Sequence, residues 1–443
     1  MTESANTGQP DILLAHQQAH TAFSNKADRS ATGWLQSVRE RAMQDFSISG
    51  FPSTRDEDWK YTSLTKVAER SAAFLGQEPA VADTNSVTQQ LAQLTEISGC
   101  NSVVFANGQF QRELSNLPEG NTGVTIETLS HANEGLREQV LRHLGENANA
   151  DSSRLAALNT AFLADGLVIT VPADVTLDAP IHVIFTTDNQ AGSSQPRILL
   201  NLEQNSRAIL IEQHIGHGAG LTNAITEIEC QKGAHLKYVK LQEESRDAYH
   251  LAAQSINMAE DSHVEALHLD LGSLLARNDL RVNLTGTGAS ADLYGLFLVD
   301  GERHIDNHTR MDHLAENTTS RENYRGVIDD RGRGIFNGKI IVHPGADRTD
   351  AQMNNRNLVL SRTGEIDTKP ELEIYTDDVK CSHGATTGQL DKDAIFYLQT
   401  RGVAESEARQ MLITAFAREV LNFIEIGALG NYIETAVAER LPV

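Results

Sequence analysis

Three short apolar stretches decide the fold: Leu167-Val-Ile-Thr-Val171, Ile181-His-Val-Ile-Phe185 and Ile198-Leu-Leu-Asn-Leu202. Each is rich in aliphatic residues and is followed by turn-forming residues, which is the pattern of a buried β-strand. Similar stretches recur at roughly ten- to fifteen-residue spacing as far as Leu372-Glu-Ile-Tyr375, with no convincing helix between them. Such an array is too long for one sandwich. The sequence therefore predicts a mainly β protein built as a solenoid of stacked rungs.

Apolar side chains recur at helical spacing on both sides of this strand array. Before the array, the helical stripe consists of Trp34, Val38, Ala42 and Phe46. After the array, two stripes consist of Ala408, Leu412, Phe416 and Val420, and then of Ile433 and Val437. We therefore expect a mostly helical N-terminal region with a small strand element (1–165), a β-solenoid core (166–401) and a helical C-terminal region (402–443).

The composition restricts the partners and the compartment. The 443 residues include 60 acidic and 37 basic side chains, a formal net charge of −23. Nucleic acids and anionic membranes attract basic surfaces, so neither is expected as a partner. Three scattered cysteines do not make a disulphide framework, which favours a reducing compartment. Without a signal-like start or an apolar run of about 18 residues, we expect a cytoplasmic protein.

The candidate chemical site is Cys381-Ser-His383, near the end of the strand array. Residues i and i+2 of a strand project to the same side, so the thiol and the imidazole would face the same space. Both groups are ligands for iron–sulphur centres and for soft or borderline metal ions. The pair is half a metal site at most. Either other ligands come from elsewhere, or the pair is a buried cysteine beside a hydrogen-bonded histidine.

The densest group of histidines is His304-Ile-Asp-Asn-His308, followed by His313. On a strand, His304, Asp306 and His308 would share one face. That arrangement suits a divalent metal ion, and it suits a hydrogen-bonded ladder equally well. The sequence favours the ladder, because nothing else in the stretch completes a metal site.

The remaining motifs do not predict a metal-binding or nucleotide-binding site. His214-Ile-Gly-His217 is interpreted as a turn, and Cys230 as a buried thiol within a strand. Gly338-Lys339 is followed by Ile340, whereas a phosphate-binding loop needs Ser or Thr at that position. The chain is therefore not expected to hydrolyse ATP itself.

Longer motifs carry a resemblance to a known family. The C-terminal two thirds contain Gly326-Val-Ile-Asp-Asp-Arg-Gly-Arg-Gly-Ile-Phe-Asn-Gly338, Asp378-Val-Lys-Cys-Ser-His-Gly-Ala-Thr-Thr-Gly388 and Tyr397-Leu-Gln-Thr-Arg-Gly402. Together they resemble the SufB/SufD family of iron–sulphur cluster assembly proteins. Glu57-Asp-Trp-Lys-Tyr-Thr62 is similar to the N-terminal motif of SufD. The N-terminal region has no cysteine cluster, and Gly384 stands where the SufB-like pattern has an acidic residue, so the chain resembles SufD.

The resemblance implies a right-handed parallel β-helix and a non-catalytic scaffold subunit. Its partners would be a SufB-like paralogue, whose β-helix pairs with this one, and a SufC-like ATPase, which docks on the C-terminal helical stripes. His383 would lie at the paralogue interface as a metal ligand to a transient iron–sulphur cluster, with Cys381 beside it. No cofactor would be held stably by this chain alone. Self-pairing into a homodimer, and a flavin in the complex, are left open.

Two alternatives compete with this interpretation. A solenoid enzyme that acts on polysaccharides would need paired acids on one face. Asp329-Asp330 and Asp377-Asp378 are adjacent in sequence, so their side chains would point to opposite faces of a strand. A purely structural solenoid predicts that His383→Ala has no effect, whereas the scaffold role predicts a lower yield of cluster.

Overall fold

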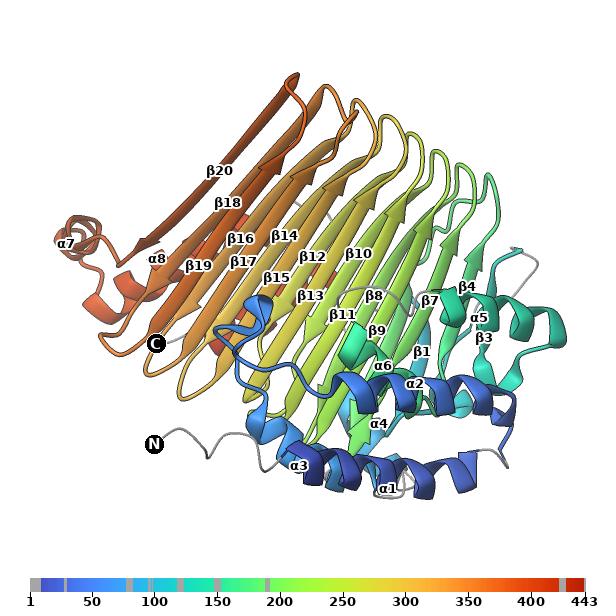
Figure 1. The fold of residues 1–443 in the computed structure, drawn as a ribbon. Helices are drawn as coiled ribbons and strands as arrows, with labels where there is room; N and C mark the ends of the chain where they lie inside the picture. The colour runs from blue at the N-terminus through green and yellow to red at the C-terminus, as the bar shows by residue number, and fades with distance from the viewer. Residues whose placement is uncertain are drawn as a thin grey trace, which may run out of the picture.

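The structure is a computed structural model that describes residues 9–27, 30–76, 83–94, 97, 99–117, 123–146, 153–187, 192–421 and 428–441. Two large sheets face each other along its length (Figure 1). Sheet A consists, in spatial order, of β2 (Gln109–Phe110), β1 (Asn101–Ala106), β5 (Ile181–Thr187), β8 (Arg207–Gly216), β10 (His235–Gln242), β12 (His263–Asp270), β14 (Ser290–Val299), β16 (Thr319–Ile328), β18 (Thr349–Val359) and β20 (Val379–Gly388). Sheet B consists of β19 (Glu365–Ile374), β17 (Arg333–Val342), β15 (His304–His313), β13 (Leu275–Leu284), β11 (Tyr249–Met258), β9 (Leu221–Cys230), β7 (Arg197–Leu202), β4 (Leu167–Val171) and β3 (Thr125–Thr128), with β6 (Ser193–Ser194) paired to β9.

The chain winds between the two sheets as a parallel solenoid. From β8 to β20, successive strands alternate between sheet A and sheet B. Neighbouring strands within a sheet are parallel: Ala266 pairs with Leu293, 27 residues later, and Leu293 pairs with Glu322, 29 residues later. Each rung therefore repeats the previous one at nearly constant length. The predicted solenoid is confirmed.

The main core lies between the sheets and is made of aliphatic columns. In-register parallel pairing places equivalent side chains above one another, so each inward-facing position forms a column along the solenoid. One such column runs through Leu210, Tyr238, Ala266 and Leu293. Only 5% of the chain is aromatic, and Val, Ile, Leu and Ala fill most of this core.

Glycines allow the rungs of the solenoid to stack closely where aromatic rings fill the interior. A Cβ atom on Gly326 would lie 2.5 Å from the ring of Phe297, and one on Gly338 would lie 2.5 Å from the sulphur of Met353. Both glycines belong to the long motif that begins at Gly326. Tight packing between rungs therefore requires glycine at both positions of that motif, since a side chain at either position would overlap its neighbour.

Helices cover the outer faces of both sheets. Sheet B is covered by α1 (Gln9–Ala27), α2 (Gln36–Ser49), α3 (Thr65–Leu75), α5 (Glu134–Glu146) and α6 (Ser153–Ala161). Sheet A is covered by α4 (Thr84–Ala92), α8 (Glu405–Leu421) and α9 (Ala428–Arg440). The predicted helices at both ends of the sequence are present. In the part of the chain that the structure describes, no helix is long and apolar enough to cross a membrane.

One helix lies where the solenoid core was expected to continue. Strand β20 ends at Gly388, and α7 spans Lys392–Thr400, so the C-terminal helices begin before residue 402. The N-cap Asp391 accepts a hydrogen bond from the backbone N–H of Asp393, which fixes the start of this helix. The solenoid also begins earlier than expected, since β1 and β3, before residue 166, extend the two sheets.

Candidate functional site

Cys381 and His383 lie on β20, the last strand of sheet A. In the pairing of β20 with β18, Cys381 stands opposite Ala351 and His383 stands opposite Met353. Ala351 and Met353 are buried members of the main core, so their columns continue into Cys381 and His383. As predicted, the thiol and the imidazole occupy alternate positions on one face of a strand, and that face is the inner one.

The two side chains differ in how far the solenoid covers them. Cys381 is half-buried and packs against the end of the main core, whereas His383 is exposed. Burial raises the pKa of the Cys381 thiol, although a backbone hydrogen bond with Ala351 partly opposes this. A thiol with a raised pKa gives up its proton to a metal ion less readily than an ordinary thiol does. His383 is therefore the better ligand of the pair.

Both sheets end with an unpaired edge at this rung. Sheet A ends at β20 and sheet B at β19, and no other described strand pairs with their outer edges (Figure 1). Each of these strands has ten residues. An edge of this length presents a row of free N–H and C=O groups, which is a template for pairing with another chain. Pro370 within β19 is typical of an edge strand, because proline cannot donate a hydrogen bond.

The residues predicted to dock an ATPase are mostly occupied within this chain. Four of the six are buried, namely Ala408, Val420, Ile433 and Val437. The last three of these pack against the outer face of sheet A. The other two, Leu412 and Phe416, are half-buried. The apolar stripes are thus the surface by which α8 and α9 cover the solenoid, and a partner would have to contact other side chains of the C-terminal helices.

Large apolar side chains are exposed on the neighbouring part of the C-terminal region. Phe396 and Tyr397 of α7 are 66% and 58% exposed, and Met411 of α8 is 49% exposed. Tyr397 belongs to the third family motif, and the guanidinium of Arg401 lies 5.2 Å from its ring centre. Exposed apolar groups of this size are typical of contact surfaces.

The histidine group on β15 forms a closed polar cluster on the outer face of sheet B. Arg277 donates to Asp306 Oδ2 at 2.6 Å and to His308 Nε2 at 2.8 Å. Thr62 donates to Asp306 and lies 2.8 Å from His304 Nε2. Burial raises the pKa of Asp306, but the charge of Arg277 outweighs this and holds it well below the usual range. Protein groups therefore occupy this cluster, as the ladder interpretation predicts.

The same cluster anchors the N-terminal motif that contains Trp59. The guanidinium carbon of Arg277 lies 4.2 Å from the centre of the Trp59 ring, and Arg277 also donates to the carbonyl oxygen of Asp58 at 2.9 Å. With the contacts of Thr62, these interactions fix the motif on the solenoid. Its residues have a structural role here.

Two further predictions concern the interior. Cys230 is buried within β9, as predicted. His214 was predicted to lie in a turn, and this is wrong: it lies within β8, which extends to Gly216. Pairing with the neighbouring strands extends β8 across the glycine, since Gly216 pairs with Thr187 of β5. His313 also points inward and is hydrogen-bonded to two hydroxyl groups.

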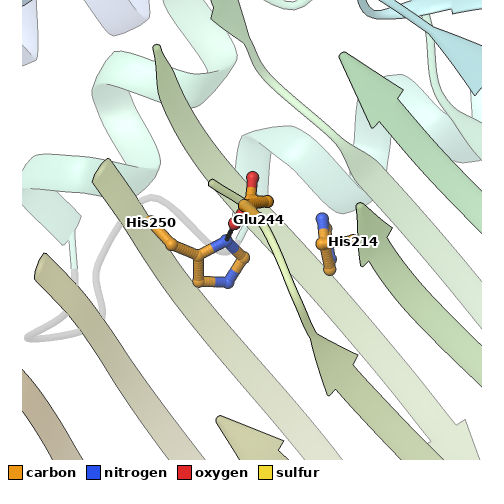
Figure 2. A group of neighbouring side chains, drawn as sticks. All are labelled: His214, Glu244 and His250. Atoms are coloured by element: carbon orange, nitrogen blue, oxygen red, sulfur yellow. Dashed lines mark ion pairs between the residues drawn. The ribbon is translucent and has the colours of Figure 1, made fainter. Parts of the chain in front are cut away.

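Sequence analysis missed a second group of metal-ligand residues inside the solenoid. His214, Glu244 and His250 are all buried, and one possible ligand atom from each lies within 4.8 Å of the others (Figure 2). They come from β8, the segment after β10, and β11. Inward-facing polar positions such as Glu212 and His214 could have drawn attention to β8. The sequence does not give the register that brings the three together.

Comparison with known proteins identifies the family. The model of the SufBD N-terminal region matches residues 15–183, and that of the SufBD core domain of the SUF iron–sulphur cluster assembly system matches residues 184–416. An iron–sulphur cluster assembly SufBD family protein of Synechocystis is 31% identical over 88% of this chain and 87% of its own length. The SufD protein of Escherichia coli is 29% identical over 98% of this chain and 99% of its own length. A SufBD family protein of Mycobacterium bovis is 25% identical over 75% of this chain and 86% of its own length. This chain therefore belongs to the SufB/SufD family of iron–sulphur cluster assembly proteins and is SufD-like.

Proposed function

We propose that this chain is a non-catalytic scaffold subunit that pairs with a SufB-like paralogue through the open rung formed by β19 and β20. The observation that carries the proposal is the coincidence of His383 with two unpaired strand edges. A partner that continues both sheets would place its own residues directly beside His383. Strand addition of this kind supplies backbone hydrogen bonds over the whole edge.

In this role the iron–sulphur cluster is the cargo of the complex. His383 contributes one imidazole to the nascent cluster, and the partner contributes thiolates, since with its raised pKa the thiol of Cys381 gives up its proton less readily. Cys381 packs against the core and sets the position of the strand that carries His383. The cluster is assembled at the junction and then leaves it, so this chain alone retains no stable cofactor.

A SufC-like ATPase docks on the C-terminal region and supplies ATP hydrolysis. The contact is made by the exposed apolar side chains Phe396, Tyr397 and Met411, because the stripes of α8 and α9 are already packed on sheet A. Movement of the ATPases, coupled through these helices, opens the paralogue junction to iron and sulphur. The complex works in the cytoplasm.

The first experiment is native mass spectrometry of the complex, purified without oxygen from cells that co-express the three kinds of chain. We expect one copy of this chain with one paralogue and bound ATPase. Disrupting the edge with Thr386→Pro in β20 should release the paralogue, because proline removes a donor and distorts the strand. A homodimer of this chain that excludes the paralogue would contradict the proposed pairing.

The second experiment separates a chemical role of His383 from a structural one. In the His383→Ala complex, iron and acid-labile sulphide per complex should fall while the subunit composition stays unchanged. Ser382→Ala is the matched control, because Ser382 is an exposed neighbour on the opposite face of the same strand. Equal cluster content in the two variants would favour the purely structural solenoid.

A further inference from the structure

The interior cluster lies at the strand ends on one side of the solenoid. His214 is two residues before the end of β8, Glu244 is two residues after the end of β10, and His250 is the second residue of β11. The three side chains come together between the sheets, and Glu244 lies between the two imidazoles in the view of Figure 2. Their relative exposures are 1%, 5% and 0%.

His214 has one ring nitrogen held and one free. Its Nε2 lies 2.7 Å from Oε1 of Glu212, a carboxylate that is itself held by the hydroxyl groups of Thr226 and Tyr238. The ring also stacks on Phe185, with the ring centres 5.0 Å apart. Its Nδ1 is buried and makes no hydrogen bond with any described residue. A buried imidazole that donates one N–H to a carboxylate, and keeps the other nitrogen free, has the arrangement of a metal-bound histidine.

His250 and Glu244 form a buried ion pair. His250 Nδ1 lies 2.7 Å from Oε2 of Glu244, so these two possible metal ligands are already in contact (Figure 2). The other nitrogen, Nε2, is 2.8 Å from the amine of Lys240. Glu244 is fixed by donation from Thr222 and Gln242. Both ligand groups are therefore held by surrounding side chains as well as by each other.

The carboxylates at this site carry negative charge. Three buried carboxylates, those of Asp270, Glu212 and Glu244, lie near the single amine of Lys240, and a buried cation needs charge partners of this kind.

We propose that the interior of the solenoid binds one divalent transition-metal ion, Fe²⁺ or Zn²⁺, through His214 Nδ1, His250 Nδ1 and the carboxylate of Glu244. Two imidazoles and one carboxylate are a common ligand set for both ions. Ligand atoms about 2.1 Å from a metal ion lie no more than about 4.2 Å apart, so the present 4.8 Å limit requires only a small closure. The site is separate from His383 and does not rest on the proposed scaffold function.

The test measures metal bound per full-length chain. Metal-free protein is supplied with Co²⁺ as a spectroscopic probe, and separately with Zn²⁺ or anaerobic Fe²⁺, both in the native state and during refolding from urea. We expect one tightly bound equivalent and intense visible Co²⁺ absorption. The His214→Gln and His250→Gln variants should lose both. Glu212→Gln should bind about tenfold to a hundredfold more weakly, since it loses only the support of His214.

Three controls decide the outcome. His268→Gln alters another buried imidazole of the same interior that lies outside the ligand set. This variant should still bind one equivalent of metal. His383→Ala should also keep it. Circular dichroism must show that every variant is folded. The proposal is overturned if the wild-type chain binds no equivalent under either loading condition, if His214→Gln retains it, or if His383→Ala removes it. Comparison of the Fe²⁺ and Zn²⁺ affinities then identifies which ion the site prefers.

Discussion

The middle rungs and the last rung of this solenoid are built from parallel strands of similar length, yet they differ in what surrounds them. A middle strand such as β16 is paired on both edges, lies over the main core and is covered on its outer face by α8. Strand β20 is paired only with β18, and most of its side chains are exposed. The same kind of strand is therefore enclosed by the rest of the chain at β16 and accessible to a partner at β20.

This difference separates the roles of the polar residues. In the middle rungs, charged side chains can pair with neighbours in the chain, as Arg277 and Asp306 do. At the last rung, the column that contains Met353 ends in an exposed imidazole, His383. In the last rung of a solenoid, inward-facing side chains are accessible to a partner, because no further rung covers them.

The largest expected effect is in the closed part of the molecule. Arg277→Ala leaves the buried Asp306 carboxylate without its main partner and removes the contact with Trp59, so we expect a loss of about 3–5 kcal/mol of stability. The control is Arg331→Ala, which breaks an exposed ion pair with Glu302 and should change stability by less than about 1 kcal/mol. Urea unfolding followed by circular dichroism measures both. Similar losses in the two variants would contradict the distinction.

The second prediction concerns pH and Glu322 of β16. Burial raises the pKa of Glu322 to about 7, although a hydrogen bond from Thr309 opposes this. Because this pKa is above the unfolded value, the folded state binds the proton more tightly. The stabilising contribution is complete at pH 4 and is lost as pH rises to about 8, by about 3 kcal/mol in total.

Glu322→Gln removes this dependence. The stability of the wild type should fall relative to that of the variant between pH 5 and pH 8, and the variant should be the more stable at pH 8. Urea unfolding at several pH values measures the difference between the two proteins. A constant difference across this range would show that Glu322 does not titrate there.

The third prediction compares two glycines. Gly326→Val adds a side chain where a Cβ atom would lie 2.5 Å from the Phe297 ring, so overpacking should cost about 1–3 kcal/mol. Gly388, at the end of β20, has no heavy atom within 4 Å of the position that a Cβ atom would take, and Gly388→Val should change stability by less than about 0.5 kcal/mol. Thermal unfolding of both variants checks this. A severe loss in Gly388→Val would mean that the last rung is not open.

The smallest expected effect is that of His383→Ala on stability. His383 is exposed, so its removal should change the free energy of unfolding by less than about 0.5 kcal/mol. His313→Ala is the comparison in a closed rung, where loss of the side chain removes two buried hydrogen bonds, to Thr318 and Ser320, and should cost about 1–3 kcal/mol. Differential scanning fluorimetry of the two variants tests this ranking, and equal losses would refute it.

Prediction from sequence was most successful where local pattern and burial agree. The aliphatic runs that begin at Leu167 became strands, and the stripe that contains Phe46 became a helix. Prediction failed where pairing overrode a local pattern, as at His214, which remains in β8 despite Gly216. It was incomplete at the C-terminal helices: the apolar stripe containing Val420 was found, but its partner, sheet A, could not be read from periodicity.

The sequence by itself determined the solenoid class, the helical ends, the family and the placement of Cys381 and His383 on one face of a strand. These follow from side-chain periodicity and from motifs that are contiguous in the chain. Only the tertiary structure decided that His383 lies on an open rung, that the stripe of α8 is covered, and that His214, Glu244 and His250 meet. Each of these depends on register between strands about thirty residues apart, which local sequence does not encode.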